Sequence, residues 1–236
     1  MKKEQNAEKT KVGKLARTKE KVSQWTTNPL NEKVLDYHNY EMTKSESVLY
    51  FVAAFLVGGV VSQFFYGGLF QEDGVPTLLT YISNSAAFVI VGLLVGKVFL
   101  PVRSRQLAEK RRDTLRRQFR DMLESLTASL AANSTVRDAF STAYTDMCMQ
   151  YSDDALISKE LDQFRRAEQI NVTLDVMMDD FAKRSGVEEI QDFNNVFQVC
   201  YGPGGNMSRV INQTHDIICE RMEVEDEIQA DRKSVV

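Results

Sequence analysis

The stretch YGPGGNMSRV, residues 201–210, is the first candidate for chemistry, because glycine-rich loops can hold phosphate groups. A Walker loop needs GxxxxGK followed by Ser or Thr after a strand, and a dinucleotide loop needs GxGxxG in a βαβ unit. The stretch has neither spacing, contains no lysine and follows a segment with helical periodicity. Glycine permits positive φ, and proline disfavours helix in the residue before it, so the stretch predicts a turn between two helices. Asn206 can cap the helix that follows.

Side chains for acid–base, nucleophilic or metal chemistry are scarce. The chain has three cysteines, none in a CxxC pair, and two histidines in separate regions. Neighbouring residues on a helix point about 100° apart, so adjacent carboxylates rarely converge on one reacting atom. Such doublets occur at Asp153 and Asp154, Asp179 and Asp180, and Glu188 and Glu189. We therefore expect no catalytic residues, no metal site and no cofactor, and the free cysteines indicate a reducing compartment.

Two apolar segments are long enough to cross a membrane. Residues 48–66 contain no charge, and residues 77–100 contain only Lys97 near the end. Each could span a hydrocarbon core of roughly 30 Å as a helix. Basic residues precede the first segment and follow the second, whereas the short loop between the two segments has none. We therefore expect both termini in the cytoplasm. Gly92 and Gly96 form a GxxxG spacing, which predicts close packing against the other span or another subunit, although this spacing also arises by chance in apolar segments.

The remaining segments divide the chain into a polar tail and a helical domain. Residues 1–47 are polar, and we expect residues 1–30 to form a mobile or interfacial tail because they have too few apolar side chains for a core. After Pro101 every segment has apolar residues at helical spacing. We therefore predict an all-α protein, with a transmembrane hairpin at 48–100 and a cytoplasmic bundle of about six helices at 101–236.

The turns of this domain follow a pattern. Asn133 and Asn171 each precede a short motif with Thr two positions later, which predicts tight turns between helices.

The charges of the helical domain are unevenly distributed. Residues 103–120 hold eight basic and two acidic residues, whereas residues 121–236 hold ten basic and twenty-two acidic residues. The positive neck is typical of a membrane-proximal cytoplasmic segment. The acidic part would repel nucleic acid and favour a basic protein partner, although solubility alone also explains it.

The order of these features resembles the TadB-like platform proteins of tight-adherence (Tad/Flp) pilus machines, within the type II secretion F-domain family. The resemblance runs from about Leu35 to the end of the sequence. The segments that carry it are DYHNYEMTKSESVLYF before the first span, then AKRSG, YGPGGNMSRVINQT and IICERMEVEDEI. Its most specific part is GGN with the helix that follows.

The resemblance implies a multi-pass protein of the inner membrane with no chemistry of its own. It implies a hexameric secretion ATPase, a sister platform protein, pilin subunits and membrane lipid as partners, and a homo-oligomer is expected. The matching positions carry over as turn and helix-packing positions without catalytic roles; they are Gly186, Gly204, Gly205, Asn206, Arg221 and Glu223. Family members have two further spans after the bundle, so we interpret the ending QADRKSVV as a truncated chain or a short variant.

A second hypothesis is a membrane-anchored helical scaffold or signalling module without an ATPase partner. Such a module should show a sustained heptad seam, whereas the apolar stripes break every 15 to 25 residues. A membrane-bound enzyme is a third class, and the sequence lacks the residue types that it would need.

Overall fold

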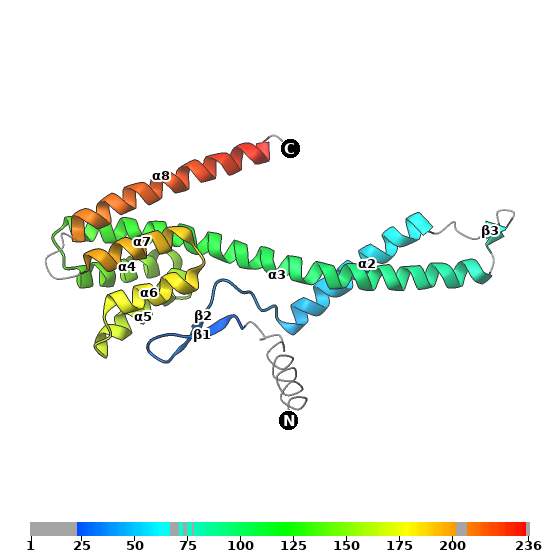
Figure 1. Cartoon of the computed structure of the whole chain (residues 1–236), viewed down its shortest axis with the longest axis horizontal. Helices are drawn as coiled ribbons and strands as arrows, with labels where there is room; N and C mark the ends of the chain where they lie inside the picture. The colour runs from blue at the N-terminus through cyan, green and yellow to red at the C-terminus, as the bar shows by residue number, and fades with distance from the viewer. Residues whose placement is uncertain (1–22, 67–70, 73–74, 77, 202–206, 235–236) are drawn as a thin grey trace, which may run out of the picture.

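The computed structural model describes residues 23–66, 71–72, 75–76, 78–201 and 207–234. Helices account for most of these residues, and the strands that are described form two very short hairpins. The predicted all-α class is confirmed. Figure 1 shows an elongated molecule with the helical bundle at one end and a helix pair at the other.

The helix pair consists of α2, Lys44–Tyr66, and the first part of α3, Leu78–Ala131. Between them lie β3, Gln71–Glu72, and β4, Val75–Pro76. Both helices are long and apolar enough to cross a membrane, and only 22% and 11% of their apolar windows are buried inside the protein. A core helix of a soluble protein would be mostly buried, so these exposed apolar surfaces favour contact with lipid.

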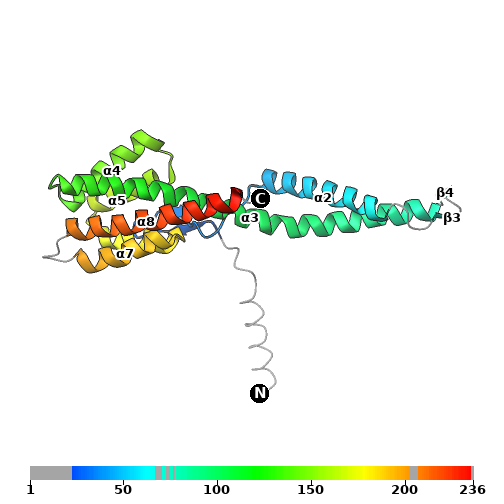
Figure 2. The ribbon, with the colours of Figure 1, turned by 90° about the horizontal axis from the view of Figure 1, so that it is seen from above.

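α3 continues without a break from the apolar pair into the bundle (Figure 2). Pro101, where the sequence predicts the boundary between the hairpin and the bundle, lies inside this helix. A proline removes one backbone N–H, but tertiary contacts on both sides can keep the chain helical. At 1.5 Å per residue the 54 residues of α3 measure about 80 Å. One continuous helix therefore belongs to both predicted domains.

The bundle contains the second part of α3 and five further helices, in agreement with the predicted six. They are α4, Val136–Tyr151; α5, Leu156–Gln169; α6, Leu174–Ser185; α7, Glu188–Cys200; and α8, Met207–Ser234. The predicted apolar stripes form one core, in which Phe119 on α3 contacts Phe181 on α6 and Phe193 on α7. Each helix thus buries the stripe that its periodicity indicates.

The predicted asparagine turns are confirmed. Asn133 and Asn171 have φ of 61° and 58°, the left-handed conformation that asparagine tolerates better than most residues. Thr135 then caps α4 by accepting a hydrogen bond from the Asp138 backbone N–H. Thr173 occupies the corresponding position before α6 but makes no side-chain cap bond.

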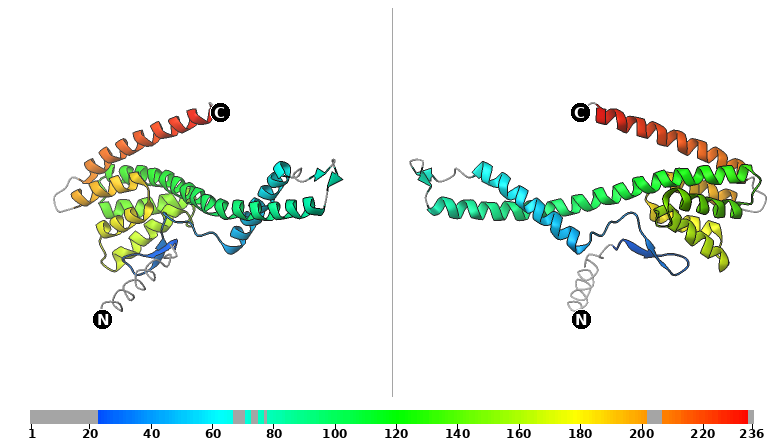
Figure 3. Two further views of the ribbon diagram at one scale, coloured as in Figure 1. Left: turned by 45° about the vertical axis from the view of Figure 1, so that its right-hand side comes forward. Right: turned by 180° about the vertical axis from the view of Figure 1, so that it is seen from behind.

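Residues 23–30 differ from the expected mobile or interfacial tail, because they pack against the bundle. Residues 1–22 lie outside the described part, but residues 23–43 run along the bundle as far as the start of α2; we call this segment the strap (Figure 3). It begins with β1, Trp25–Thr27, paired antiparallel with β2, Lys33–Leu35. Asn28, predicted in the tail, is only 4% exposed. Buried polar contacts hold the strap together with Val34 and Tyr37, which are 3% and 1% exposed, and composition alone does not reveal these contacts.

Candidate coupling site

The turn of the strap hairpin positions its side chains against α5. The Asn28 side-chain oxygen accepts hydrogen bonds from the backbone N–H groups of Leu30 and Glu32, at 3.0 and 2.8 Å. Asparagine stabilises turns in this way because its short side chain reaches the backbone two residues on. The Asn28 amide also donates to Gln163 Oε1 on α5 at 3.1 Å. The hairpin is therefore tied to the bundle through its turn.

An ion pair between α5 and α6 lies under the strap. Arg184 Nη1 and Nη2 donate to the two oxygens of Glu160 at 3.0 and 2.8 Å, and both residues are almost completely buried. Arg184 Nε donates to Asp180 Oδ2 one turn earlier on α6, at 2.7 Å. The planar guanidinium suits this two-point contact with a carboxylate. The pair fixes the two helices relative to each other.

The strap completes this cluster through Tyr37 and Leu35. The Tyr37 hydroxyl donates to Glu160 Oε1 at 2.9 Å, and its backbone N–H donates to the Arg184 carbonyl at 3.0 Å. Arg184 Nη1 also donates to the Leu35 carbonyl at 2.9 Å. We call Tyr37, Glu160, Asp180 and Arg184 the polar node. It joins three segments that are far apart in the sequence.

The protonation states of the polar node follow from burial and charge. Burial, followed by the negative charge of Glu160, raises the pKa of Tyr37 well above its usual value. Burial lowers the pKa of Arg184, but hydrogen bonds and charge from Glu160 and Asp180 outweigh it and raise that pKa above its ordinary range. Tyr37 therefore stays a neutral donor and Arg184 a cation.

Beyond the polar node, the strap contacts the neck of α3 before it enters α2. The Arg111 guanidinium lies 4.5 Å from the centre of the Tyr40 ring, in a cation–π contact. Ser104 Oγ donates to the Tyr40 carbonyl at 2.6 Å. α2 begins four residues later, at Lys44. The bundle is thus linked to the apolar helix pair twice, through α3 and through the strap.

Gly186, carried over from the resemblance, ends α6 in the left-handed conformation with φ of 61°. A Cβ there would lie 3.1 Å from Arg112 Cδ and 3.2 Å from His38 Nε2. Both the backbone angle and the close neighbours favour glycine. The position brings α6, the neck of α3 and the strap together beside the polar node.

The other carried-over positions are separate from the node. Arg221 on α8 donates to Asp192 on α7 at 2.8 Å and approaches Glu188 at 3.5 Å, so it joins the last two helices. Glu223 is exposed on α8. Gly204, Gly205 and Asn206 lie outside the described residues, between α7 and α8.

Gly92 and Gly96 lie on the side of α3 that faces α2. A Cβ on Gly92 would lie 2.7 Å from Phe55 Cδ2 and 2.9 Å from the Phe55 carbonyl oxygen, and one on Gly96 would lie 2.6 Å from Phe51 Cε2. α2 contributes its own glycines, since a Cβ on Gly58 would lie 2.9 Å from Val95 Cβ. The two backbones therefore approach closely within the chain.

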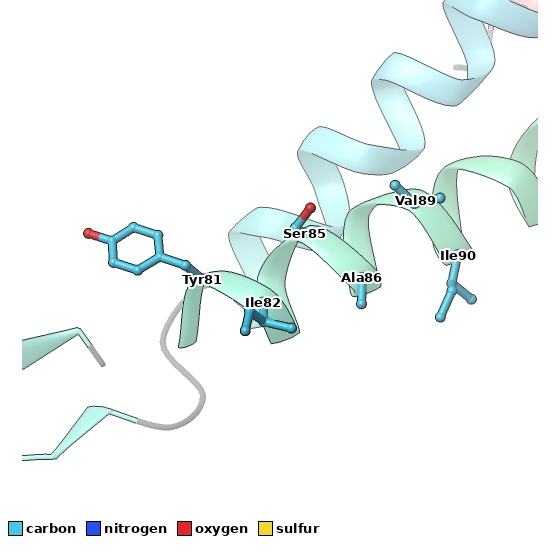
Figure 4. A pocket seen from close by; sticks show the side chains of 6 residues that line it. All are labelled: Tyr81, Ile82, Ser85, Ala86, Val89 and Ile90. Atoms are coloured by element: carbon cyan, nitrogen blue, oxygen red, sulfur yellow. The ribbon is translucent and has the colours of Figure 1, made fainter. Parts of the chain in front are cut away.

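The opposite side of α3 is apolar and uncovered. Figure 4 shows Ile82, Ala86 and Ile90 pointing away from α2. Ile82 and Ile90 are each 58% exposed. This surface suits lipid or a further helix.

The acidic doublets do not converge. Asp179 binds Lys183 and Asp180 binds Arg184, so neighbouring carboxylates belong to different ion pairs. Glu189 binds Arg116 on α3, whereas Glu188 lies near Arg221 on α8. Within the described residues no group of three or more His, Cys, Asp or Glu is placed to hold a metal ion.

One arrangement on α8 resembles a nucleophile with its base. Cys219 Sγ lies 3.4 Å from His215 Nε2, and His215 Nδ1 lies 3.1 Å from Asp216 Oδ1. A nucleophilic cysteine needs a lowered pKa. Burial, opposed by Arg120, raises the pKa of Cys219, with further upward contributions from the carboxylates of Glu223 and Glu124. The thiol is therefore held in its unreactive form.

Sequence reasoning missed the polar node, although one signal was present. Glu160 and Arg184 each occupy a position at helical spacing from core residues, Glu160 three after Ile157 and Arg184 three after Phe181. A charged residue within an apolar stripe indicates a buried partner. Tyr37 is 147 residues from Arg184, and no local pattern connects them.

No family model, curated protein or solved structure matches the chain. The role of the site is therefore inferred from its geometry and from the sequence motifs.

Proposed function

We propose that this chain is a platform protein of the inner membrane in a Tad/type IV-like pilus or type II secretion-like machine. In this role it couples a cytoplasmic secretion ATPase to the extraction and polymerisation of pilin. The observation that carries the proposal is the unbroken α3, which connects an apolar, membrane-length segment with the bundle. The assignment to a pilus or secretion machine rests on the resemblance of the sequence motifs.

The second link supports a mechanical role. A bundle held by α3 alone could pivot about one helix, whereas the strap also holds it to the start of α2 through Tyr40 and the polar node. A force on the bundle would therefore reach both apolar helices. Coupling of this kind needs rigid elements with few soft joints.

The proposed orientation places the bundle in the cytoplasm. In the sequence the basic N-terminal region precedes the helix pair and the basic neck follows it, a distribution typical of cytoplasmic flanks. The bundle would meet the hexameric ATPase, and the apolar helices would meet lipid, pilin subunits, a sister platform protein and further copies of the chain.

The test separates binding of the ATPase from transmission of force. Full-length protein in native membranes is co-purified with the cognate ATPase, and surface pili are counted. In one variant the exposed neck residues Arg105 and Gln106 are both replaced by Gly, which weakens the helix by about 1 kcal/mol per residue relative to Ala. The matched control replaces both with Ala.

We expect the glycine variant to retain ATPase association and lose pili, and the alanine control to keep both. An absence of ATPase association in the unmodified protein would favour the scaffold or signalling alternative. Normal piliation in the glycine variant, with association intact, would contradict the role of α3 as a rigid coupler.

A further inference from the structure

α8 carries a second apolar stripe that the bundle leaves uncovered. Ile217, Val224 and Ile228 are 61%, 51% and 49% exposed. Their spacings of seven and four residues place them along one line of the helix, as in the seam of a coiled coil. Ile218 and Met222 point instead into the core, where they are 3% and 1% exposed. α8 therefore has two apolar faces, of which the bundle uses one.

The packing of α8 fixes the direction of this stripe. Arg221 binds Asp192 on α7 midway along the stripe, so the helix cannot turn freely about its axis to bury it. Figures 1 and 3 show α8 running back from the bundle toward the apolar helix pair, with its final part standing away from α3. The stripe continues into this final part with Val224 and Ile228.

The charges beside the stripe indicate which kind of molecule could cover it: a second copy of the chain, a membrane surface or a partner protein. Glu220 and Glu227, seven residues apart, form an exposed acidic row along its edge, in the place where coiled coils position their pairing charges. Asp216, also exposed, extends the acidic character of the helix. A second copy in the same membrane has the same orientation, so its α8 would pair in parallel and place its Arg221 against Arg221 of the first copy at the seam, where like charges destabilise the pair. An anionic membrane surface would be repelled by the acidic row.

From the spacing, exposure and charge, we infer that this face of α8 is a docking surface for a basic amphipathic helix of a partner protein. Apolar side chains of that helix contact Ile217, Val224 and Ile228, and its lysines or arginines pair with Glu220 and Glu227. The surface does not depend on the proposed pilus role, because a scaffold would present it equally.

The probe is a synthetic helical peptide of three heptads with leucine at the seam positions and lysine beside them. Its counterpart has glutamate in place of lysine. Full-length protein is held in nanodiscs of zwitterionic lipid, and binding is measured by fluorescence anisotropy. We expect the lysine peptide to bind at least about tenfold more tightly than the glutamate peptide, with affinity falling as salt is added.

Two variants locate the binding. Replacing Ile217 and Val224 together with Asp should weaken lysine-peptide binding by at least about tenfold, because both side chains lose apolar burial. The matched control is Val176→Asp on α6, which changes another exposed valine and should bind as the unmodified protein does.

The charge variant combines Glu220→Lys with Glu227→Lys and should reverse the preference between the two peptides. Asp154→Lys, at a carboxylate 94% exposed before α5, is its control. Helical circular dichroism must match in all variants. Equal binding of both peptides, or unchanged binding in the Ile217 and Val224 variant, would overturn the inference. Self-association of the unmodified protein that Val224→Asp abolishes would also overturn it, in favour of a second copy.

Discussion

Arg184 donates to four oxygen atoms in three segments: both carboxylate oxygens of Glu160, one of Asp180 and the Leu35 carbonyl. Placing two charges out of water is costly, and it is compensated only when nearly every donor and acceptor has a partner. The guanidinium meets this condition because the strap supplies the last acceptor. The stability of the bundle therefore depends on the packed strap, because Arg184 needs the Leu35 carbonyl as an acceptor.

We expect Glu160→Gln to lower the free energy of unfolding by about 3 kcal/mol, because it leaves the Arg184 charge buried with a weaker partner. Thermal or denaturant unfolding of the detergent-solubilised protein, followed by circular dichroism, measures the change. Lys183→Gln is the control, since Lys183 is exposed and pairs with Asp179 at the surface. Equal melting of the two variants would contradict a structural role for the polar node.

Tyr37 predicts a pH dependence whose sign follows from its raised pKa. The folded protein holds the hydroxyl proton more tightly than the unfolded chain, so this stability is complete below a pH of about 10 and declines above it. The difference in unfolding free energy between unmodified protein and Tyr37→Phe should therefore shrink by about 1.4 kcal/mol per pH unit above that point. A difference that is constant from pH 9 to 11 would show that Tyr37 ionises alike in both states.

At the scale of elements, helices with a regular apolar stripe could be predicted and the strap could not. α3, α5 and α6 bury the side chains that their periodicity indicates. The strap has two three-residue strands and is held by Asn28, by the buried side chains of Val34 and Tyr37 and by a few backbone bonds, so it has no period to detect. The boundary between the hairpin and the bundle, predicted at Pro101 where the apolar segment ends, does not interrupt α3.

The helix pair predicts an asymmetric response to side-chain size. Gly92→Ile should loosen α2 from α3, because the added carbons meet Phe55 and its backbone. The cost should be about 1 to 3 kcal/mol. Ala86→Ile adds bulk on the exposed side of the same helix and is the control. Disulfide crosslinking between cysteines introduced on the facing sides of the two helices measures the separation, and equal crosslinking in both variants would contradict close packing.

At the scale of the whole molecule, the two links between bundle and helix pair differ in kind. α3 is a continuous helix, whereas the strap is a short extended segment fixed at the polar node and again at Tyr40. The sequence indicated a hairpin followed by a bundle, which is correct for the order of elements. It could not indicate that two separate links, α3 and the strap, join the two parts, because the contacts of the strap pair residues more than 60 positions apart.

Because α3 is continuous, the length of the neck determines how the bundle is oriented relative to the helix pair. Each residue added to or removed from the neck would turn the bundle by about 100° around the helix axis and shift it by 1.5 Å. The strap, whose length would stay the same, cannot follow such a turn while keeping Tyr37 on Glu160 and Tyr40 on the neck. The rotation of the bundle about the α3 axis is therefore fixed relative to the helix pair. The number of residues in the neck sets the direction in which α8 faces.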